Sequence, residues 1–154
     1  MNILFVCTAN ICRSFMAERI IKKKLDEDGR SDIHVSSAGL LDMGGTGADP
    51  VAAAVLEAGG YDADGHRSRQ LTGEIVAGAD KIMVMERRHK DYIETLFEDV
   101  GDKVYLLKPF SQGCEQLYIN DTLDINDPHG LSVYSYRLCF AEVSLAIEGL
   151  LTCL

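Results

Sequence analysis

The sequence predicts an α/β fold, in which a parallel sheet is covered by helices on both faces. Short apolar runs of strand length alternate along the chain with longer segments whose apolar residues recur at helical spacing. The 154 residues, 47% of them hydrophobic, suffice for the core of one domain of ordinary size. Neither a repeat nor a low-complexity linker interrupts the alternation. We therefore expect residues 1–154 to form a single domain.

The first half of the chain shows this alternation clearly. Between two short apolar runs lies a segment with the apolar spacing of an amphipathic helix, and Gly29 marks its end. Further along, Asp49 and Pro50 are typical of a helix cap and first turn, and a pair of glycines closes that helix. The elements predicted here are strands at 2–6 and 34–37 and helices at 15–28 and from 50 to the glycines at 59–60.

The second half repeats the pattern and adds one long connection. Strands are predicted at 81–85 and 103–107, and a helix at 87–97 lies between them. Residues 108–130 form a loop too long for a simple connection, and such loops are usually functional or disordered. A final helix is predicted at 131–150, with a buried face that comprises Val133, Leu138, Val143 and Ile147.

Charge and cysteine content limit the possible partners and the compartment. The formal net charge of −9 repels nucleic acid and anionic membrane, so we expect neither as a partner. No apolar run approaches the roughly 20 residues of a membrane span, and the first residues lack the basic region of a signal peptide. Five cysteines in such a chain predict reduced thiols in a cytoplasmic protein, with core or surface positions for Cys114, Cys139 and Cys153.

The stretch VCTANICRS, residues 6–14, carries the strongest chemical signal. Cys7 lies where the first strand ends, and Arg13 and Ser14 lie where the first helix begins. A loop in this position can surround an anion with backbone N–H groups, and the planar guanidinium of Arg13 matches a phosphate. The same positive environment is expected to lower the pKa of Cys7, and Ser14 can donate a hydrogen bond to the thiolate. The pattern therefore predicts a nucleophile at the base of an anion site.

Two other interpretations of Cys7 remain open at this point. Cysteine is among the most buried residue types, so Cys7 could be a core thiol. Cys7 and Cys12 could also ligate a metal, but their spacing is unusual and no second Cys/His pair follows nearby. We therefore expect a site without metal or other cofactor.

The loop resembles that of the low-molecular-weight protein tyrosine phosphatases, whose pattern is V-C-x-G-N-x-C-R-S-P. Ala9 replaces the usual glycine and Phe15 the usual proline. The resemblance continues in 37–39 (Ser-Ala-Gly), in 81–85 and in 127–128 (Asp-Pro), and so covers essentially the whole chain. It implies a four-stranded parallel sheet and hydrolysis through a cysteinyl phosphate. It also implies catalytic roles for Cys7 and Arg13, substrate contacts from Thr8, Ala9, Asn10, Ile11, Cys12 and Ser14, and support of Asn10 by Ser37 and His66.

Asp127 is the candidate proton donor of the site. The leaving oxygen of a phosphomonoester needs a proton, and the loop around Cys7 contains no acid to supply it. A positioned carboxylic acid can deliver it, and Pro128 restricts the backbone of Asp127 to extended conformations. By the resemblance, Asp127 is the acid of the first step and the base of the second. Asp124, three residues earlier, is interpreted as a solvated loop charge.

The walls of the cleft depart from the family pattern. Members that act on phosphotyrosine usually carry Trp or Tyr after Ser-Ala-Gly, whereas this chain has LLDMGGTG and no Trp. We expect Leu41 and Met43 to line the cleft, with Tyr118 as the aromatic contact and Phe110 in the core. Related arginine phosphatases tend to have Thr in the loop where this chain has Ile11, which favours a phosphotyrosine pocket.

The predicted function is hydrolysis of protein phosphotyrosine, with a phosphotyrosine-containing protein, such as a tyrosine kinase, as the partner. An arginine phosphatase of the same fold is one alternative. A phosphate-binding module with little turnover is another, because the Cβ of Ala9 could distort the loop. Arsenate reductases of this fold use a further cysteine pair in mid-chain, which residues 70–100 lack. The resemblance also supports a reversible disulfide between Cys7 and Cys12 under oxidation.

Overall fold

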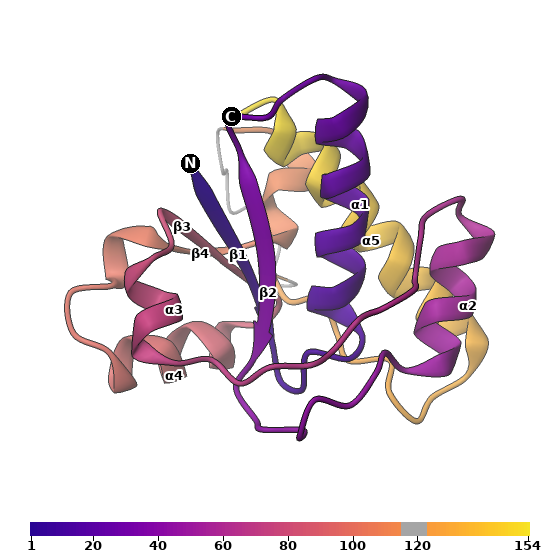
Figure 1. The fold of residues 1–154 in the computed structure, drawn as a ribbon, viewed down its shortest axis with the longest axis horizontal. Helices are drawn as coiled ribbons and strands as arrows, with labels where there is room; N and C mark the ends of the chain where they lie inside the picture. The colour runs from indigo at the N-terminus through magenta and orange to yellow at the C-terminus, as the bar shows by residue number, and fades with distance from the viewer. Residues whose placement is uncertain (115–122) are drawn as a thin grey trace.

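The computed structural model describes residues 1–114 and 123–154 and contains a four-stranded parallel sheet (Figure 1). The strand order is β2-β1-β3-β4, so the first strand lies inside the sheet with a neighbour on each side. This arrangement confirms the predicted fold class. The strands are β1 (Asn2–Cys7), β2 (His34–Gly39), β3 (Lys81–Val84) and β4 (Val104–Leu106).

Helices cover both faces of the sheet, as Figure 1 shows, with α1, α2 and α5 on one side and α3 and α4 on the other. The short helix α3 was not predicted, because five residues are too few to display a helical period. The loop predicted at 108–130 begins with a 3₁₀ helix, Lys108–Gln112. The α-helices are α1 (Arg13–Glu27), α2 (Pro50–Ala58), α3 (Gly73–Ala77), α4 (Arg87–Leu96) and α5 (Val133–Leu151).

The alternation of side chains along β1 divides the core into two clusters. Ile3 and Phe5 pack with α1, α2 and α5, whereas Leu4 and Val6 pack with the side of α3 and α4. All four side chains are buried, which is typical of a parallel strand covered on both faces. Cys7 ends β1 on the α1 side, and so the strand delivers its thiol to the edge where the helix begins.

The buried face of α5 was predicted only in part. Val143 and Ile147 are buried as expected, but Val133 and Leu138 are each 50% exposed. Leu138 precedes the buried Cys139 by one residue, and one residue turns the direction of a helical side chain by about 100°. Phe110 is buried in the cluster below α5, which confirms its predicted core position.

The cysteine assignments need one correction. Cys114 and Cys153 form a disulfide across 39 residues of sequence, so they are not the separate thiols that the sequence predicted. The remaining three, Cys7, Cys12 and Cys139, are free and buried. Among the described residues, no helix is both long and apolar enough to cross a membrane.

Candidate active site

The loop from β1 to α1 is folded tightly against the end of β2. Gly39 makes this possible, because a Cβ at this position would lie 2.8 Å from Ala9 C and from Asn10 N. Such an approach is too close for any side chain, so the loop requires glycine at residue 39. Leu41 N donates to Thr8 O at 2.9 Å, which fixes the segment after β2 beside the same loop.

Asn10 makes the turn of the loop. Its φ of 57° is in the left-handed region, which Asn tolerates better than most residues. Asn10 Nδ2 donates to Ser14 Oγ at 2.9 Å and to Ser37 Oγ at 2.8 Å, and Asn10 Oδ1 accepts from Arg69 N at 3.0 Å. Ala9 is not among the described non-glycine residues with positive φ, so its Cβ introduces no left-handed strain.

His66 contacts the backbone of the same turn. Its Nε2 lies 2.6 Å from Asn10 O, which fits a hydrogen bond donated by the ring. Burial lowers the pKa of His66, although this hydrogen bond opposes the effect. Ser37 in turn donates to Glu18 on α1. The structure thus brings Ser37 and His66 to Asn10, where the sequence had expected them.

Cys7 lies at the bottom of the loop and is 2% exposed. Its Sγ is 3.0 Å from Ser14 Oγ, and the N-terminus of α1 begins beside it at Arg13. The partial positive charge of a helix N-terminus favours an anion at this position. Cys12 is buried as well, and its proximity to Cys139 together with that burial raises its pKa. Cys12 is therefore held as a thiol, although it lines the same pocket as Cys7.

Arg13 connects the loop to the other end of the chain. Its guanidinium is buried, with Nη1 bonded to Glu86 and, at 3.0 Å, to Ile125 O. Nη2 lies 2.8 Å from Asp127 Oδ2. Burial pulls the pKa of Glu86 upward, but hydrogen bonds from Arg88 and Arg13 outweigh it and hold that pKa at about 2. Arg13 is thus a fixed cation beside a permanent carboxylate.

We call residues 7–13 the phosphate loop and 124–130 the acid loop, after their predicted roles; Asp127 lines the same pocket as the phosphate loop. Ile125 N donates to Met85 O at 2.8 Å, and this bond ties the segment to the end of β3. His129 Nδ1 lies 2.9 Å from Asp49 Oδ2, and Tyr136 OH donates to the same oxygen at 3.0 Å. Asp49 also caps α2, and its backbone N donates to Ile11 O at 2.8 Å. Asp49 therefore joins the two loops, with its carboxylate bound to the acid loop and its backbone N–H bound to the phosphate loop.

Comparison with known proteins now decides the family. The family model described as low molecular weight phosphotyrosine protein phosphatase matches residues 2–154. The chain belongs to this family. It is 36% identical over 149 residues to a protein-arginine-phosphatase of Geobacillus stearothermophilus, covering 97% of this chain and 93% of the relative. It is also 36% identical over 147 residues to the low molecular weight protein-tyrosine-phosphatase Wzb of Escherichia coli K12, covering 96% and 88%.

Solved structures of low molecular weight phosphatases have the same fold. The phosphatase from T. tengcongensis has a TM-score of 0.88 and 33% identity, covering 100% of this chain and 99% of its own. The YwlE arginine phosphatase from Geobacillus stearothermophilus has a TM-score of 0.85 and 36% identity, covering 99% and 91%. These two structures confirm the predicted fold, and a tyrosine phosphatase and an arginine phosphatase share it.

The cleft of this phosphatase is a pocket of about 240 Å³ above Cys7. Leu41 and Met43 line it, as expected, and Ile11 adds a third apolar wall. His129 lines it too, and the sequence had given this residue no role. Tyr118, the expected aromatic contact, lies outside the described residues. Apart from Asp127 and the polar residues of the loop itself, the described walls of the cleft are therefore apolar, with one imidazole.

His89 is a buried neighbour of the site that sequence reasoning missed. Its Nε2 lies 3.0 Å from Thr8 Oγ1, and Arg13 Nη2 is 3.4 Å from that same oxygen. No described residue offers a partner to His89 Nδ1. Burial, reinforced by the charge of Arg13, lowers the pKa of His89 to about 4. Neutral His89 and Thr8 thus form a wall beside the guanidinium of Arg13.

We expect His89 to make the stability of this phosphatase sensitive to acid. The unfolded chain takes up a proton near pH 6.5 that folded His89 takes up only near pH 4, so stability is lost as pH falls between these values. The full effect is about 3 kcal/mol in the free energy of unfolding. The free energy of unfolding, measured with urea at several pH values across this range, should depend less steeply on pH in His89→Gln. His34→Gln, at an exposed histidine, is the control and should leave the pH dependence unchanged. An unchanged pH dependence in His89→Gln would contradict the assignment.

The prediction for Asp124 was wrong, because this side chain is not merely a solvated charge. Its Oδ1 accepts a hydrogen bond from Arg87 N at 2.7 Å, and Arg87 Nε lies 3.7 Å from the same oxygen. Asp124 therefore satisfies a backbone N–H at the first residue of α4 and fixes the base of the acid loop.

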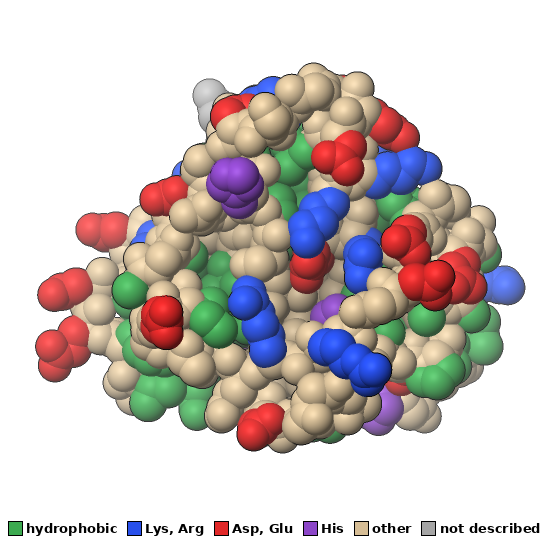
Figure 2. All heavy atoms as spheres, in the orientation of Figure 1, with side chains coloured by type: hydrophobic (Ala, Val, Ile, Leu, Met, Phe, Trp, Pro, Cys, Tyr) green, Lys and Arg blue, Asp and Glu red, His purple; other side chains and the backbone are tan. Residues whose placement is uncertain are grey.

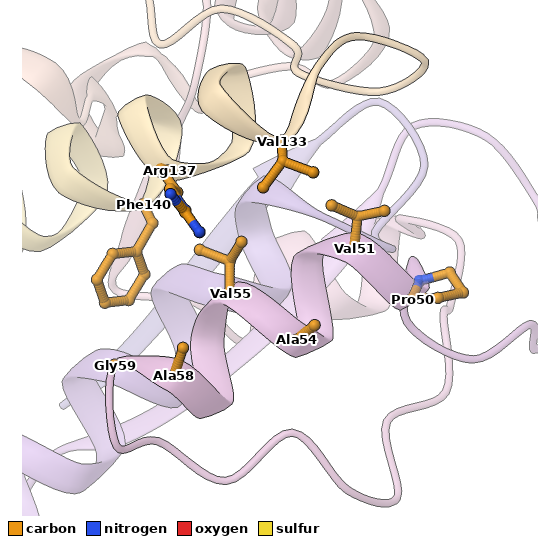
Figure 3. A pocket seen from close by; sticks show the side chains of 9 residues that line it. All are labelled: Pro50, Val51, Ala54, Val55, Ala58, Gly59, Val133, Arg137 and Phe140. Carbon is orange, nitrogen blue, oxygen red and sulfur yellow. The ribbon is translucent and has the colours of Figure 1, made fainter.

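Two further hollows lie away from the cleft. One, of about 340 Å³, opens between α1, β2 and the segment 65–69, and Figure 2 shows Lys and Arg side chains gathered around it. The other is a groove of about 530 Å³ between α2 and α5, lined by apolar side chains with Arg137 among them (Figure 3). The groove is the largest of these hollows but contains none of the residues around Cys7. Among the described residues, no group of three or more His, Cys, Asp or Glu side chains could hold a metal ion.

Proposed function

We propose that this phosphatase hydrolyses phosphotyrosine in proteins, with residues 1–154 acting as a single catalytic domain. The partner is a tyrosine-phosphorylated protein, a class that includes tyrosine kinases themselves. The observation that carries the proposal is an apolar cleft directly above Cys7, with Ile11, Leu41 and Met43 in its walls. A phenyl ring buries apolar area against such walls, and the phosphate then reaches the loop.

In the first step, the thiolate of Cys7 attacks the phosphorus and the bond to the leaving oxygen breaks. Asp127 donates a proton to that oxygen, which leaves as the tyrosine hydroxyl. Arg13 and the backbone N–H groups of the loop stabilise the charge on the three other phosphate oxygens. The support for these roles is geometric, because Arg13 lies 2.8 Å from Asp127 and Cys7 lies in the same pocket.

In the second step, water attacks the phosphorus of the cysteinyl phosphate. Asp127, now a carboxylate, takes a proton from the water, and the bond from phosphorus to sulfur breaks. Inorganic phosphate leaves and the thiolate of Cys7 returns. Ser14 donates a hydrogen bond to this sulfur, since their atoms are 3.0 Å apart, and makes the thiolate a better leaving group. The scheme needs no metal.

Phosphoarginine is the second candidate substrate, because relatives of both specificities are equally similar to this chain. A phosphorylated guanidine carries several N–H donors that need acceptors. The cleft presents Ile11, Leu41 and Met43 where such donors would lie. Burying unpaired N–H groups is costly, so these walls favour the phenyl ring.

Hydrolysis of matched phosphotyrosine and phosphoarginine peptides in the presence of a chelator tests the function. We expect the larger kcat/KM for phosphotyrosine, without loss of activity to the chelator. A larger value for phosphoarginine would replace the proposal with its alternative. Phosphate binding without turnover of either peptide would leave a binding module, and the unstrained backbone at Ala9 argues against that outcome.

The variant Leu41→Trp should improve binding of phosphotyrosine peptides. Leu41 is 53% exposed at the rim of the cleft, so a larger ring fits without repacking the core. Aromatic stacking adds about 0.5–1.5 kcal/mol, which predicts a KM lower by roughly two- to tenfold. Steady-state kinetics with one peptide measures this change. Leu40→Trp is the comparison variant, since Leu40 does not line the cleft; equal effects of both substitutions would exclude a specific wall at Leu41.

A further inference from the structure

The hollow between α1, β2 and the segment 65–69 has an unusual charge for this protein. Three arginines line it, Arg19, Arg67 and Arg69, together with one carboxylate, Glu18. Its lining is therefore net positive, whereas the whole chain has a formal net charge of −9. Figure 2 shows this concentration of basic side chains around the depression. We call this site the arginine hollow.

Arg67 and Arg69 keep hydrogen-bond donors available for a ligand, whereas Arg19 already donates to Asp64 O at 2.7 Å and lies 3.7 Å from Asp62 Oδ2. The Nε of Arg19 is buried and has no partner among the described residues. Arg69 uses its side-chain Nε for Ser37 O at 2.8 Å, and Arg67 makes only a 3.5 Å contact with Gly45 O. Neither Arg67 nor Arg69 has an ion pair with any residue that the structure describes.

The carboxylate in the arginine hollow is already engaged. Glu18 accepts a hydrogen bond from Ser37, and its other oxygen lies 2.5 Å from Lys22 Nζ. These two contacts offset the repulsion that Glu18 would exert on an incoming anion. Burial lowers the pKa of His66, which also lies in the lining.

We propose that the arginine hollow is a second anion site that binds inorganic phosphate, separate from the loop of Cys7. Its volume of about 340 Å³ accommodates a small phosphate dianion with water around it. Guanidinium groups bind phosphate through paired N–H donors, which Arg67 and Arg69 can supply. Inorganic phosphate is also the product released by a phosphatase, so the ligand is formed beside this site.

The site is connected to the phosphate loop by short contacts. Arg69 N donates to Asn10 Oδ1 at 3.0 Å, and His66 lies 2.6 Å from Asn10 O. Phosphate in the arginine hollow would therefore order the residues that hold the turn at Asn10. Occupancy of the second site stabilises the loop in the conformation that receives substrate.

Titration with inorganic phosphate, followed by NMR, tests the proposal. Backbone signals of 8–13 report on the first site, and the side-chain Nε–H signals of Arg19 and Arg69 report on the second. We expect two different dissociation constants in the wild-type protein. Arg67→Gln should weaken only the second by about tenfold, the value of one charged hydrogen bond. Arg137→Gln removes the same charge from the groove in Figure 3 and should change neither constant.

Either of two results would overturn the proposal. If the arginine signals follow the same binding curve as residues 8–13, and Arg67→Gln leaves that curve unchanged, the shifts in the arginine hollow reflect only binding at the first site. Absence of any shift at Arg19 and Arg69 would also exclude it. The measurement does not depend on turnover, so it stands even if the proposed substrate is wrong.

Discussion

Replacing Cys7 by serine is expected to remove turnover while phosphate binding persists. A serine hydroxyl at this position is a much weaker nucleophile than a thiolate, so kcat should fall by at least about 10⁴-fold, as nucleophile substitutions do in other hydrolases. The substitution leaves Arg13 and the N-terminus of α1 in place. Because those groups bind the phosphate, the affinity for inorganic phosphate should change little.

The matched control for this variant is Cys139→Ser. Cys139 is a free, buried cysteine like Cys7, but it lies on α5 rather than in the cleft. We expect Cys139→Ser to keep its activity towards an aryl phosphate. Substantial activity in Cys7→Ser would remove Cys7 from the role of nucleophile. Loss of both activity and phosphate binding would instead point to collapse of the loop.

The regular part of the fold could be predicted because its signals are local. The cap and proline at Asp49 and Pro50 mark the start of α2, and the structure places the helix where they indicate. Other features depend on contacts that no local pattern contains. Val133 has helical spacing with the core residues, yet it faces the groove beside α2. The pairing of Cys114 with Cys153 likewise depends on how the chain returns in space.

The site was predictable to a similar extent. The loop around Cys7 and Arg13 is one contiguous motif, and Asp127 follows from the chemistry that this motif requires. His89 and Glu86 could not be found in this way, because they reach the loop from the first turn of α4 and its N-cap. Asp49 was recognised only as a helix cap, since its bonds to His129 in the acid loop and to Tyr136 on α5 come from residues 80 and 87 positions later.

Replacing Asp127 by asparagine is the second substitution with a large expected effect. Asparagine keeps the shape of the side chain but cannot donate a proton to the leaving oxygen as an acid does. Loss of a general acid costs about 10²–10⁴-fold in rate. We expect this loss with phosphotyrosine, whose leaving oxygen is basic. An aryl phosphate with a strongly electron-withdrawing ring needs less help, so its first step should slow far less.

The comparison of the two leaving groups distinguishes proton transfer from simple disruption. Asp127 also pairs with Arg13, so Asp127→Asn weakens one contact of the guanidinium, while Glu86 and Ile125 O still hold it. A displaced Arg13 would slow both substrates equally, because it acts on the phosphate that they share. Asp124→Asn is the matched control, since Asp124 carries the same charge in the same loop but binds Arg87 N. It should reduce turnover of both substrates only slightly. Single-turnover kinetics of phosphotyrosine and of the activated aryl phosphate gives the two rates, and equal losses in Asp127→Asn would exclude Asp127 as the acid.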